Sequence, residues 1–466
     1  TIVPGKLDRL KEVQATLDEI KKDFLDPFAE VQGISVAHLA AQLNDEKTLQ
    51  ILIENNQSLS EKDLNQMSPL DFAILHNSLE AAKILLENTE EDLQEDFGED
   101  IALHYAAQVG SPEMINFLLE KGAPISATGD GLRIPLHYAA RDNSPSVVQL
   151  LLSKGANIHT LAEGKKTSLH YASEKNSTEV IQLLLDNKAN IHAKDENDKT
   201  PLHYAVERNS AEVIQLLINN KADIHVKDKE GKTPLHYAIE RNSPELVQLL
   251  INNGADINAK DNEGKTPFHY ATEKNSEEVI AFLKNSETAI HAKNKRSKTF
   301  SYLEVETNLA KIIQLLINNN ANIHIKDNEG KTPFHYALEK SSEKVIQSVL
   351  DHTGINFVDE EGNTPLWYAI KNKLHDRIPL LLQEGANPNE KNNANQTPMM
   401  YVTETSDMES VILLAEQGAL FDENSLKAVA TILNAACLEN APDLDCLKLL
   451  LEKGVVLDED AVDALM

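Results

Sequence analysis

Cysteine and long apolar runs are nearly absent from this 466-residue chain. Only Cys437 and Cys446 occur, both near the carboxyl end, which excludes a disulfide scaffold and is typical of a reducing compartment. Two buried thiols, or a close pair on neighbouring helices, are the alternatives for them. No apolar run approaches the roughly 18 residues that span a bilayer, and the amino terminus does not resemble a signal peptide. The sequence therefore predicts a cytoplasmic protein without a membrane partner.

Basic residues are scarce relative to acidic ones. The chain has 44 lysines and arginines against 74 aspartates and glutamates, which gives a formal net charge of −30. Such a charge repels nucleic acid and anionic membranes, and it favours basic protein segments as partners. The sequence also lacks a nucleophile elbow, a phosphate-binding loop and the common zinc motifs. We therefore expect no enzymatic activity, no cofactor, no metal and no nucleic-acid partner.

The most prominent feature of the sequence is a short motif that recurs at a fixed spacing. The string Thr-Pro-Leu-His-Tyr-Ala stands at 200–205 and 233–238, a spacing of 33 residues, with close variants at 167–172, 266–271 and 332–337. The histidine position of this motif recurs every 33 residues along the chain, except for one step of 32 residues between His335 and Trp367. It is occupied by His38, Asp71, His104, His137, His170, His203, His236, His269, Tyr302, His335, Trp367 and Met400. A register kept over twelve units excludes chance and predicts a repeat protein.

A 33-residue period that carries Thr-Pro-Leu-His-x-Ala resembles the ankyrin repeat family, whose unit is a β-turn followed by two antiparallel helices. The resemblance covers residues 30–458 and implies an all-α solenoid of stacked helix-turn-helix units with β-hairpin-like loops. We expect an N-terminal capping helix segment over residues 1–29, twelve ankyrin repeats over 30–425, and a degenerate C-terminal capping repeat over 426–466.

The unit at residues 228–260 shows the local signals that support this fold. Pro234 suits the first turn of a helix, where its missing N–H is not needed. Asn242 tolerates the left-handed conformation that commonly follows a helix, and Ser243 is a good N-cap for the second helix. Gly254 ends that helix. Helices this short cannot bury their apolar faces alone, so neighbouring repeats must cover them.

The sixteen histidines do not predict a metal site. Eight occupy the motif position, where the resemblance implies a hydrogen bond that fastens the turn. A second column consists of His159, His192, His225, His291 and His324. Equivalent positions in packed repeats are about 8–10 Å apart, whereas zinc ligands lie about 2 Å from the ion, so one column cannot supply a site.

Charged residues form ladders at repeat positions that the resemblance places on the concave, partner-binding face. One ladder consists of Lys166, Lys199, Lys232, Lys265, Lys298 and Lys331, and another of Glu174, Glu207, Glu240, Glu273, Glu306 and Glu339. Recent duplication with ion pairs that neutralise one another is one interpretation, since such surface pairs contribute little. A periodic polar groove for a long partner is the other.

Repeats that depart from the pattern are the candidates for specific binding. Between Glu87 and Asp100, eight acidic residues occur without a base, and they would attract a basic segment within a Debye length of about 8 Å. The candidate contacts there are Glu90, Glu91, Asp92, Glu95, Asp96 and Glu99. A solvated loop is the alternative.

The ninth repeat departs in another way. Lys295 and Arg296 lie in the densest basic run, Phe300 stands where the helix-opening proline belongs, and Tyr302 replaces the motif histidine. A hinge, a site for an acidic partner and a degenerate repeat are the three interpretations of this repeat.

Near the carboxyl end, the motif positions become aromatic and sulfur-rich. Trp367 and Tyr368 occupy them in one repeat, and Met400 and Tyr401 in the next. Tryptophan and tyrosine are enriched at binding hot spots, and methionine surfaces adapt to partners. These four residues are either a partner-binding site or core residues of an atypical end.

The sequence thus predicts a non-catalytic, monomeric scaffold that binds a protein along its concave surface. Near-identical repeats rich in asparagine, lysine and isoleucine resemble arrays of intracellular bacteria, which implies a secreted effector that acts on host proteins in the host cytosol. The chain begins at Thr1 without methionine. The alternative is therefore the recognition domain of a larger enzyme or toxin.

Overall fold

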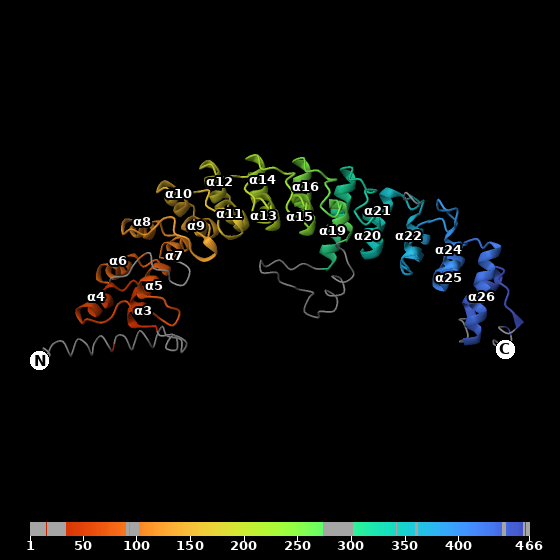
Figure 1. The fold of residues 1–466 in the computed structure, drawn as a ribbon, viewed down its shortest axis with the longest axis horizontal. Coiled ribbons are helices and arrows are strands. Elements are labelled where there is room, and N and C mark those ends of the chain that lie inside the picture. Colours follow the sequence, from red (N-terminus) through yellow and green to blue (C-terminus); the bar gives the residue numbers. More distant parts are fainter. Residues whose placement is uncertain are drawn as a thin grey trace. The chain divides into compact units, whose positions relative to one another are not determined.

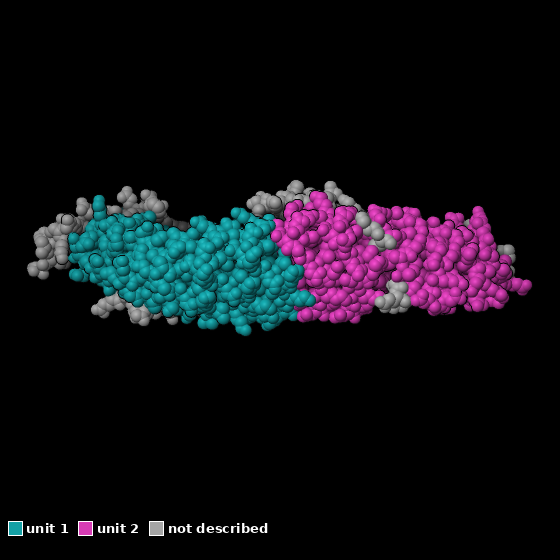
Figure 2. All heavy atoms as spheres, turned by 90° about the horizontal axis from the view of Figure 1, so that it is seen from above, with its two compact units in different colours: residues 1–229 teal, residues 230–466 magenta. Residues whose placement is uncertain are grey.

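The computed structural model describes residues 15, 34–89, 93, 102–273, 302–341, 343–358, 362–439, 444–459 and 462. These residues form helices joined by turns and loops, which confirms the predicted all-α class. The chain divides into two compact units, unit 1 (residues 1–229) and unit 2 (residues 230–466), shown in different colours in Figure 2. None of the helices described is long and apolar enough to cross a membrane. The expected capping segment, residues 1–29, lies outside the described part except for Ala15.

The first helix of a repeat begins at the motif threonine and proline. Before α15 (Pro234–Glu240), Thr233 is extended, and its backbone N–H donates to Nδ1 of His236 at 3.1 Å. The other ring nitrogen of His236 lies 3.4 Å from the carbonyl oxygen of Lys265 in the following loop. The motif histidine therefore fastens its own helix start to the next loop, as the sequence resemblance implies.

The second helix follows a tight turn. Asn242 has a φ of 52°, in the left-handed region that asparagine tolerates. The hydroxyl of Ser243 then accepts the N–H of Leu246 at 3.4 Å, which begins α16 (Pro244–Asn252). The helix buries an apolar face formed by Leu246, Val247 and Leu250. The signals predicted for this unit are confirmed.

Unit 1 consists of two rows of helices that alternate along the chain (Figure 1). The first helices are α3 (Val36–Gln42), α5 (Pro69–Leu75), α7 (Ala102–Val109), α9 (Pro135–Arg141), α11 (Ser168–Lys175) and α13 (Pro201–Glu207). The second helices are α4 (Glu46–Glu54), α6 (Leu79–Asn88), α8 (Pro112–Glu120), α10 (Pro145–Ser153), α12 (Thr178–Asp186) and α14 (Ala211–Asn219). Each first helix packs against the next first helix along the chain, so the apolar faces are covered from repeat to repeat.

Unit 2 has the same two rows (Figure 1). Its first helices are α15, α17 (Pro267–Glu273), α20 (Pro333–Lys340), α22 (Pro365–Lys371), α24 (Pro398–Glu404) and α26 (Glu423–Glu439). Its second helices are α16, α19 (Tyr302–Asn318), α21 (Glu343–Thr353), α23 (Arg377–Gln383), α25 (Met408–Glu416) and α27 (Leu444–Glu452). The last pair packs on the pair before it, α26 on α24 and α27 on α25.

The stack of unit 2 omits one repeat of the sequence. Helix α17 packs directly on α20, so the eighth repeat contacts the tenth. The backbone N–H of Asn328 donates to the carbonyl of Glu263 at 2.8 Å, whereas the regular counterpart joins Asn262 to Glu230. Helix α19 lies against both α16 and α17 and fills the place of the eighth repeat's second helix. The expected run of twelve repeats over residues 30–425 stays a prediction, because residues 274–301 lie outside the described part.

The cause lies at the junction of the two helices of the ninth repeat. Ser243 has a serine counterpart one period later, Ser276, but Leu309 stands at that position in the ninth repeat. Leucine cannot act as an N-cap, so no second helix begins at position 309. Helix α19 continues across this position over 17 residues. The described part of the ninth repeat before its loop is therefore one helix and not an antiparallel pair. Tyr302 is the first residue of α19, and Lys295 and Arg296 lie outside the described residues.

Candidate interaction surface

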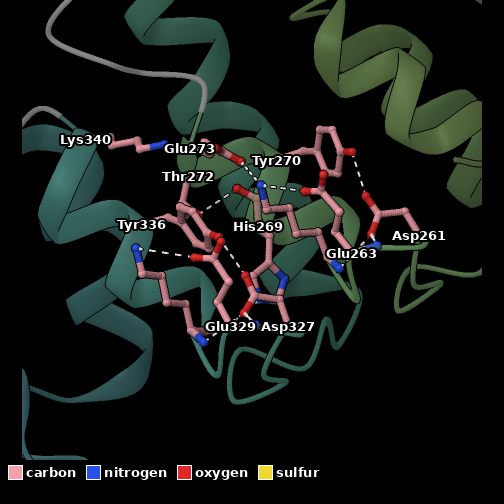
Figure 3. A network of polar contacts seen from close by, with 12 residues as sticks. Asp261, Glu263, His269, Tyr270, Thr272, Glu273, Asp327, Glu329, Tyr336 and Lys340 are labelled. Atoms are coloured by element: carbon pink, nitrogen blue, oxygen red, sulfur yellow. Dashed lines mark hydrogen bonds and ion pairs between the residues drawn. The ribbon is translucent and has the colours of Figure 1, made fainter. Parts of the chain in front are cut away.

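The loops and first helices carry a polar network, which Figure 3 shows around α17 and α20. The ammonium of Lys265 lies 2.9 Å from Glu273 and 3.1 Å from Glu263, and Lys340 of the neighbouring layer also reaches Glu273, at 2.8 Å. Partial burial opposes the charge of Lys265, but its hydrogen bonds to the two glutamates outweigh this and raise its pKa. Burial likewise opposes the charge of Glu273, and the two lysines outweigh it and lower that pKa. Both groups are therefore charged and mutually neutralised.

The same lysine–glutamate pair recurs in five repeats of the described part of the chain. The N–O distances are 3.8 Å for Lys166–Glu174, 2.7 Å for Lys199–Glu207, 3.0 Å for Lys232–Glu240, 2.9 Å for Lys265–Glu273 and 3.0 Å for Lys331–Glu339. Each partner is more than one-tenth exposed, so each pair contributes little to stability. This geometry favours the interpretation that the ladders neutralise themselves over that of a charged groove left open for a partner.

A tyrosine column completes the network. Tyr204 donates its hydroxyl to Asp195 at 2.8 Å, and Tyr270 donates to Asp261 at 2.7 Å. The other carboxylate oxygen of Asp195 accepts two backbone N–H groups of its loop, including that of Lys199. Burial raises the pKa of Tyr204 well above its usual range, and the bond to Asp195 raises it further, so the phenol stays protonated. Sequence reasoning missed this clamp, although a tyrosine after the motif histidine recurs at the repeat spacing.

The motif histidines are buried and neutral. His137 and His170 are both 0% exposed, and burial lowers the pKa of each to about 4. Their ring nitrogens lie 3.1 Å from the carbonyls of Thr160 and Lys199. Among the residues that the structure describes, no three histidine, cysteine or carboxylate side chains converge to hold a metal ion.

Asp71 replaces the motif histidine in the second repeat and is also 0% exposed. Its Oδ2 accepts the backbone N–H of Ser68 at 2.6 Å, which reproduces the histidine's bond within the helix start. Burial raises the pKa of Asp71 to about 6, although the bonds from Ser68 oppose this shift. The carboxyl group is consequently ionised at neutral pH, and the burial of this charge lowers the free energy of unfolding.

We expect Asp71→Asn to stabilise the protein at pH 7. The folded-state pKa of Asp71 lies above its unfolded value, so the folded chain binds more protons between about pH 4 and 6 and loses stability as pH rises through that window. A shift of about two units corresponds to about 3 kcal/mol, which the amide avoids while it keeps an oxygen for Ser68. Urea unfolding at pH 7 and pH 4 would measure this. Equal stability of Asp71→Asn and the exposed control Asp186→Asn at pH 7 would contradict it.

Trp367 makes the same hydrogen bond to the following loop as the motif histidine does in other repeats. Its ring is 1% exposed, and its indole N–H donates to the carbonyl of Glu390 at 2.9 Å. That carbonyl is 23 residues further along, the same separation as between His137 and Thr160. Trp367 therefore belongs to the core of its repeat and presents almost no surface to a partner.

The other three candidates of this region lie at the surface. Tyr368 is half-buried, donates its hydroxyl to Glu339 and has its ring 4.0 Å from that of His335. Met400 and Tyr401 are half-buried on α24, and the ring of Tyr401 lies 5.6 Å from that of Trp367. The hydroxyl of Tyr401 has no hydrogen-bond partner among the residues that the structure describes. The six acidic candidates, Glu90, Glu91, Asp92, Glu95, Asp96 and Glu99, lie outside the described residues.

The lysine–glutamate ladder stops where these residues begin. Asn363 and Gln396 occupy the lysine position of the last two repeats, and Lys371 occupies the glutamate position of the eleventh. Lys371 is exposed, and within the described part of the chain no carboxylate forms an ion pair with it. It borders a hollow of about 400 Å³ that Lys331 and Tyr368 also line. The lysine–glutamate pairing of the earlier repeats is thus not continued at Asn363 and Lys371.

The chain belongs to the ankyrin repeat family. A family model described as ankyrin repeats in three copies matches residues 9–96, 37–128, 89–162, 136–228, 209–294, 303–392 and 371–461. This membership, predicted from the period and the motif, is confirmed. It makes the chain a protein–protein interaction scaffold of a family that is generally non-catalytic.

Two solved structures are similar over about half of the chain. The ankyrin repeat domain of Bcl-3, a member of the IkappaB protein family, is 27% identical, with coverage of 54% of this chain and 98% of that domain and a TM-score of 0.42. The human ASB11 ankyrin repeat domain is also 27% identical, with coverage of 48% and 99% and a TM-score of 0.44. No curated protein sequence matches the chain.

Proposed function

We propose that the chain binds a protein partner on the loops and first helices of its last two repeats. The observation that carries this proposal is the end of the neutralising ladder at Lys331–Glu339. Beyond that pair, Tyr368, Met400 and Tyr401 are half-buried, and Lys371 is exposed. We call these four residues the C-terminal patch. It lies on α22 and α24, which are neighbours in the first-helix row.

The chemistry of the C-terminal patch suits a protein partner. Tyrosine and methionine offer large contact areas with few or adaptable torsions, and such residues dominate interface hot spots. The ring of Tyr401 packs on the buried Trp367, so it is held in place before a partner arrives. A contact that is already ordered loses less side-chain entropy on binding.

The acidic residues Glu90 to Glu99 form the second part of the proposal. Their charge supports attraction of a basic segment of the same or another partner. We further propose that the protein acts as a monomer in a cytosol, as a secreted effector on host proteins. The near-identical repeats rich in asparagine, lysine and isoleucine support that role.

Affinity capture with matched variants tests the C-terminal patch. Immobilised wild-type protein, the double variant Met400→Ser/Tyr401→Ser and the control Leu451→Ser would be exposed to eukaryotic lysate. Leu451 is a 44%-exposed apolar residue on the second helix α27, so the control removes similar surface elsewhere. We expect proteins retained by the wild type and the control to be lost from the double variant. Equal retention by all three, at matched circular dichroism spectra, would overturn the assignment.

A further inference from the structure

The C-terminal patch borders a hollow of about 400 Å³ between the tenth and eleventh repeats. The charged and aromatic side chains along it come from the loop before α20 and from α20 and α22, and include Lys326, Glu329, Lys331, Tyr368 and Lys371. Tyr368 is held in place, because its ring lies 4.0 Å from that of His335 and its hydroxyl donates to Glu339. The hollow therefore has an ordered wall before a partner arrives.

The charge at one repeat position is reversed beside this hollow. In the tenth repeat, Glu339 at the end of the first helix faces Lys331 at the end of the loop, with an N–O distance of 3.0 Å. The eleventh repeat has Asn363 in place of that lysine and Lys371 in place of that glutamate. A cation thus stands where the earlier repeats place a carboxylate, and the residue at the lysine position is neutral.

The charges that line the hollow do not cancel. They are three lysines and one glutamate, in a chain whose formal net charge is −30. Lys331 lies 3.8 Å from Glu329 and is also paired with Glu339. Lys371 is exposed, and none of the described carboxylates forms an ion pair with it. The hollow is therefore a locally positive site on an acidic protein, and it favours an anionic group.

We propose that this hollow receives an acidic side chain of the protein partner, an aspartate or a glutamate next to an apolar residue. The inference rests on the proposed function of the C-terminal patch and names the partner's chemistry. The partner's carboxylate pairs with Lys371 and replaces, from outside, the carboxylate that the earlier repeats supply themselves. The half-buried Met400 and Tyr401 lie on α24, which packs on α22, and they contact the apolar residue.

The two parts of the site have different roles. Exposed charge pairs at the rim of an interface contribute to specificity and to the rate of association more than to affinity. Large apolar and aromatic side chains supply most of the binding free energy. Lys371 is therefore expected to select the partner by its charge, whereas Met400 and Tyr401 hold it.

Peptide display tests which side chains the hollow selects. A library of random peptides would be panned on wild-type protein, on Lys371→Glu and on the matched control Lys373→Glu. Lys373 is exposed and does not line the hollow, so the control carries the same change of charge outside the site. The double variant Met400→Ser/Tyr401→Ser identifies the peptides that depend on the C-terminal patch, and only these are compared.

We expect patch-dependent peptides from the wild type and from Lys373→Glu to be enriched in aspartate and glutamate. Those from Lys371→Glu are expected to be enriched in lysine and arginine. In one synthetic peptide, replacement of the acid by its amide should weaken binding to the wild type by about two- to fivefold, as for an exposed ion pair, and leave binding to Lys371→Gln unchanged. Equal frequencies of acidic residues on all three proteins would overturn the inference and leave the proposed function intact.

The chain's own acids are the alternative occupants that the test must separate. Glu360 and Glu361 precede α22 in the sequence and lie outside the described residues. If acidic peptides are enriched only on the variant Glu360→Gln/Glu361→Gln, Lys371 is already neutralised in the wild type and the inference is overturned. If no peptide depends on Met400 and Tyr401, the proposed function fails as well.

Discussion

Trp367→Ala is expected to lower the free energy of unfolding of unit 2 by about 3–5 kcal/mol. The ring is 1% exposed, so its removal leaves a cavity, and the carbonyl of Glu390 loses the indole N–H that it accepts at 2.9 Å. Both effects act within the repeat and require no partner. Urea unfolding followed by circular dichroism would measure the loss, because the variant has no tryptophan left for fluorescence.

Trp367→His is the matched control for this prediction. It restores the residue of the regular motif, whose ring nitrogen makes the same bond in the repeat of His137. We expect it to lose less than half of the stability that alanine loses. If both substitutions left unfolding unchanged while partner capture was abolished, Trp367 would be a binding residue, contrary to its burial in the structure.

Mild acid is expected to unfold unit 1. Burial lowers the pKa of His137 and His170 to about 4 in the folded chain, against about 6.5 when unfolded. The folded state therefore binds fewer protons between these values, and stability that is fully present above pH 6.5 is lost as pH falls toward 4. Each histidine accounts for about 3 kcal/mol over that window, on the basis of 1.36 kcal/mol per pKa unit.

Urea midpoints at pH 7.0, 5.5 and 4.5 and constant ionic strength would show this acid sensitivity. The Asp71→Asn background separates the contribution of the histidines, because protonation of Asp71 raises stability as pH falls over part of the same range. His192→Gln is the control, since His192 is an exposed member of the second histidine column. Midpoints that do not fall between pH 7.0 and 4.5 would contradict the burial of neutral histidines.

The repeat fold was predictable because its signals are local. Pro234, Asn242 and Ser243 act within a few residues of one another, and each has the role in the structure that its chemistry predicts. The continuous helix α19 could have been suspected from Leu309, because this residue breaks the column of N-cap serines. That column alone does not decide the outcome, however: Leu374 also breaks it, and there Asp376 begins α23 two residues later. Whether the helix continues at such a position depends on packing, because Leu309 is 2% exposed in the core of its unit, which is a tertiary effect.

The candidate site was predictable only in part. A rare tryptophan at a motif position signals a departure from the pattern, but the sequence left open whether Trp367 is a core residue or a contact residue. The bond to Glu390 links positions 23 residues apart and depends on the path of the intervening loop. The lysine and glutamate ladders could be read from the sequence as repeated positions. That their charges neutralise one another depends on the two side chains meeting across the start of each first helix, as Lys265 and Glu273 do.

The described lysines of the ladder have their glutamates within the same 33-residue block, as in Lys199–Glu207. Three tyrosines of the column have their aspartates there too, in the pairs Tyr204–Asp195, Tyr270–Asp261 and Tyr336–Asp327. A block copied or deleted by unequal recombination therefore carries these pairs with it. The array can lengthen or shorten in whole blocks without separating them, which favours the accumulation of near-identical central repeats.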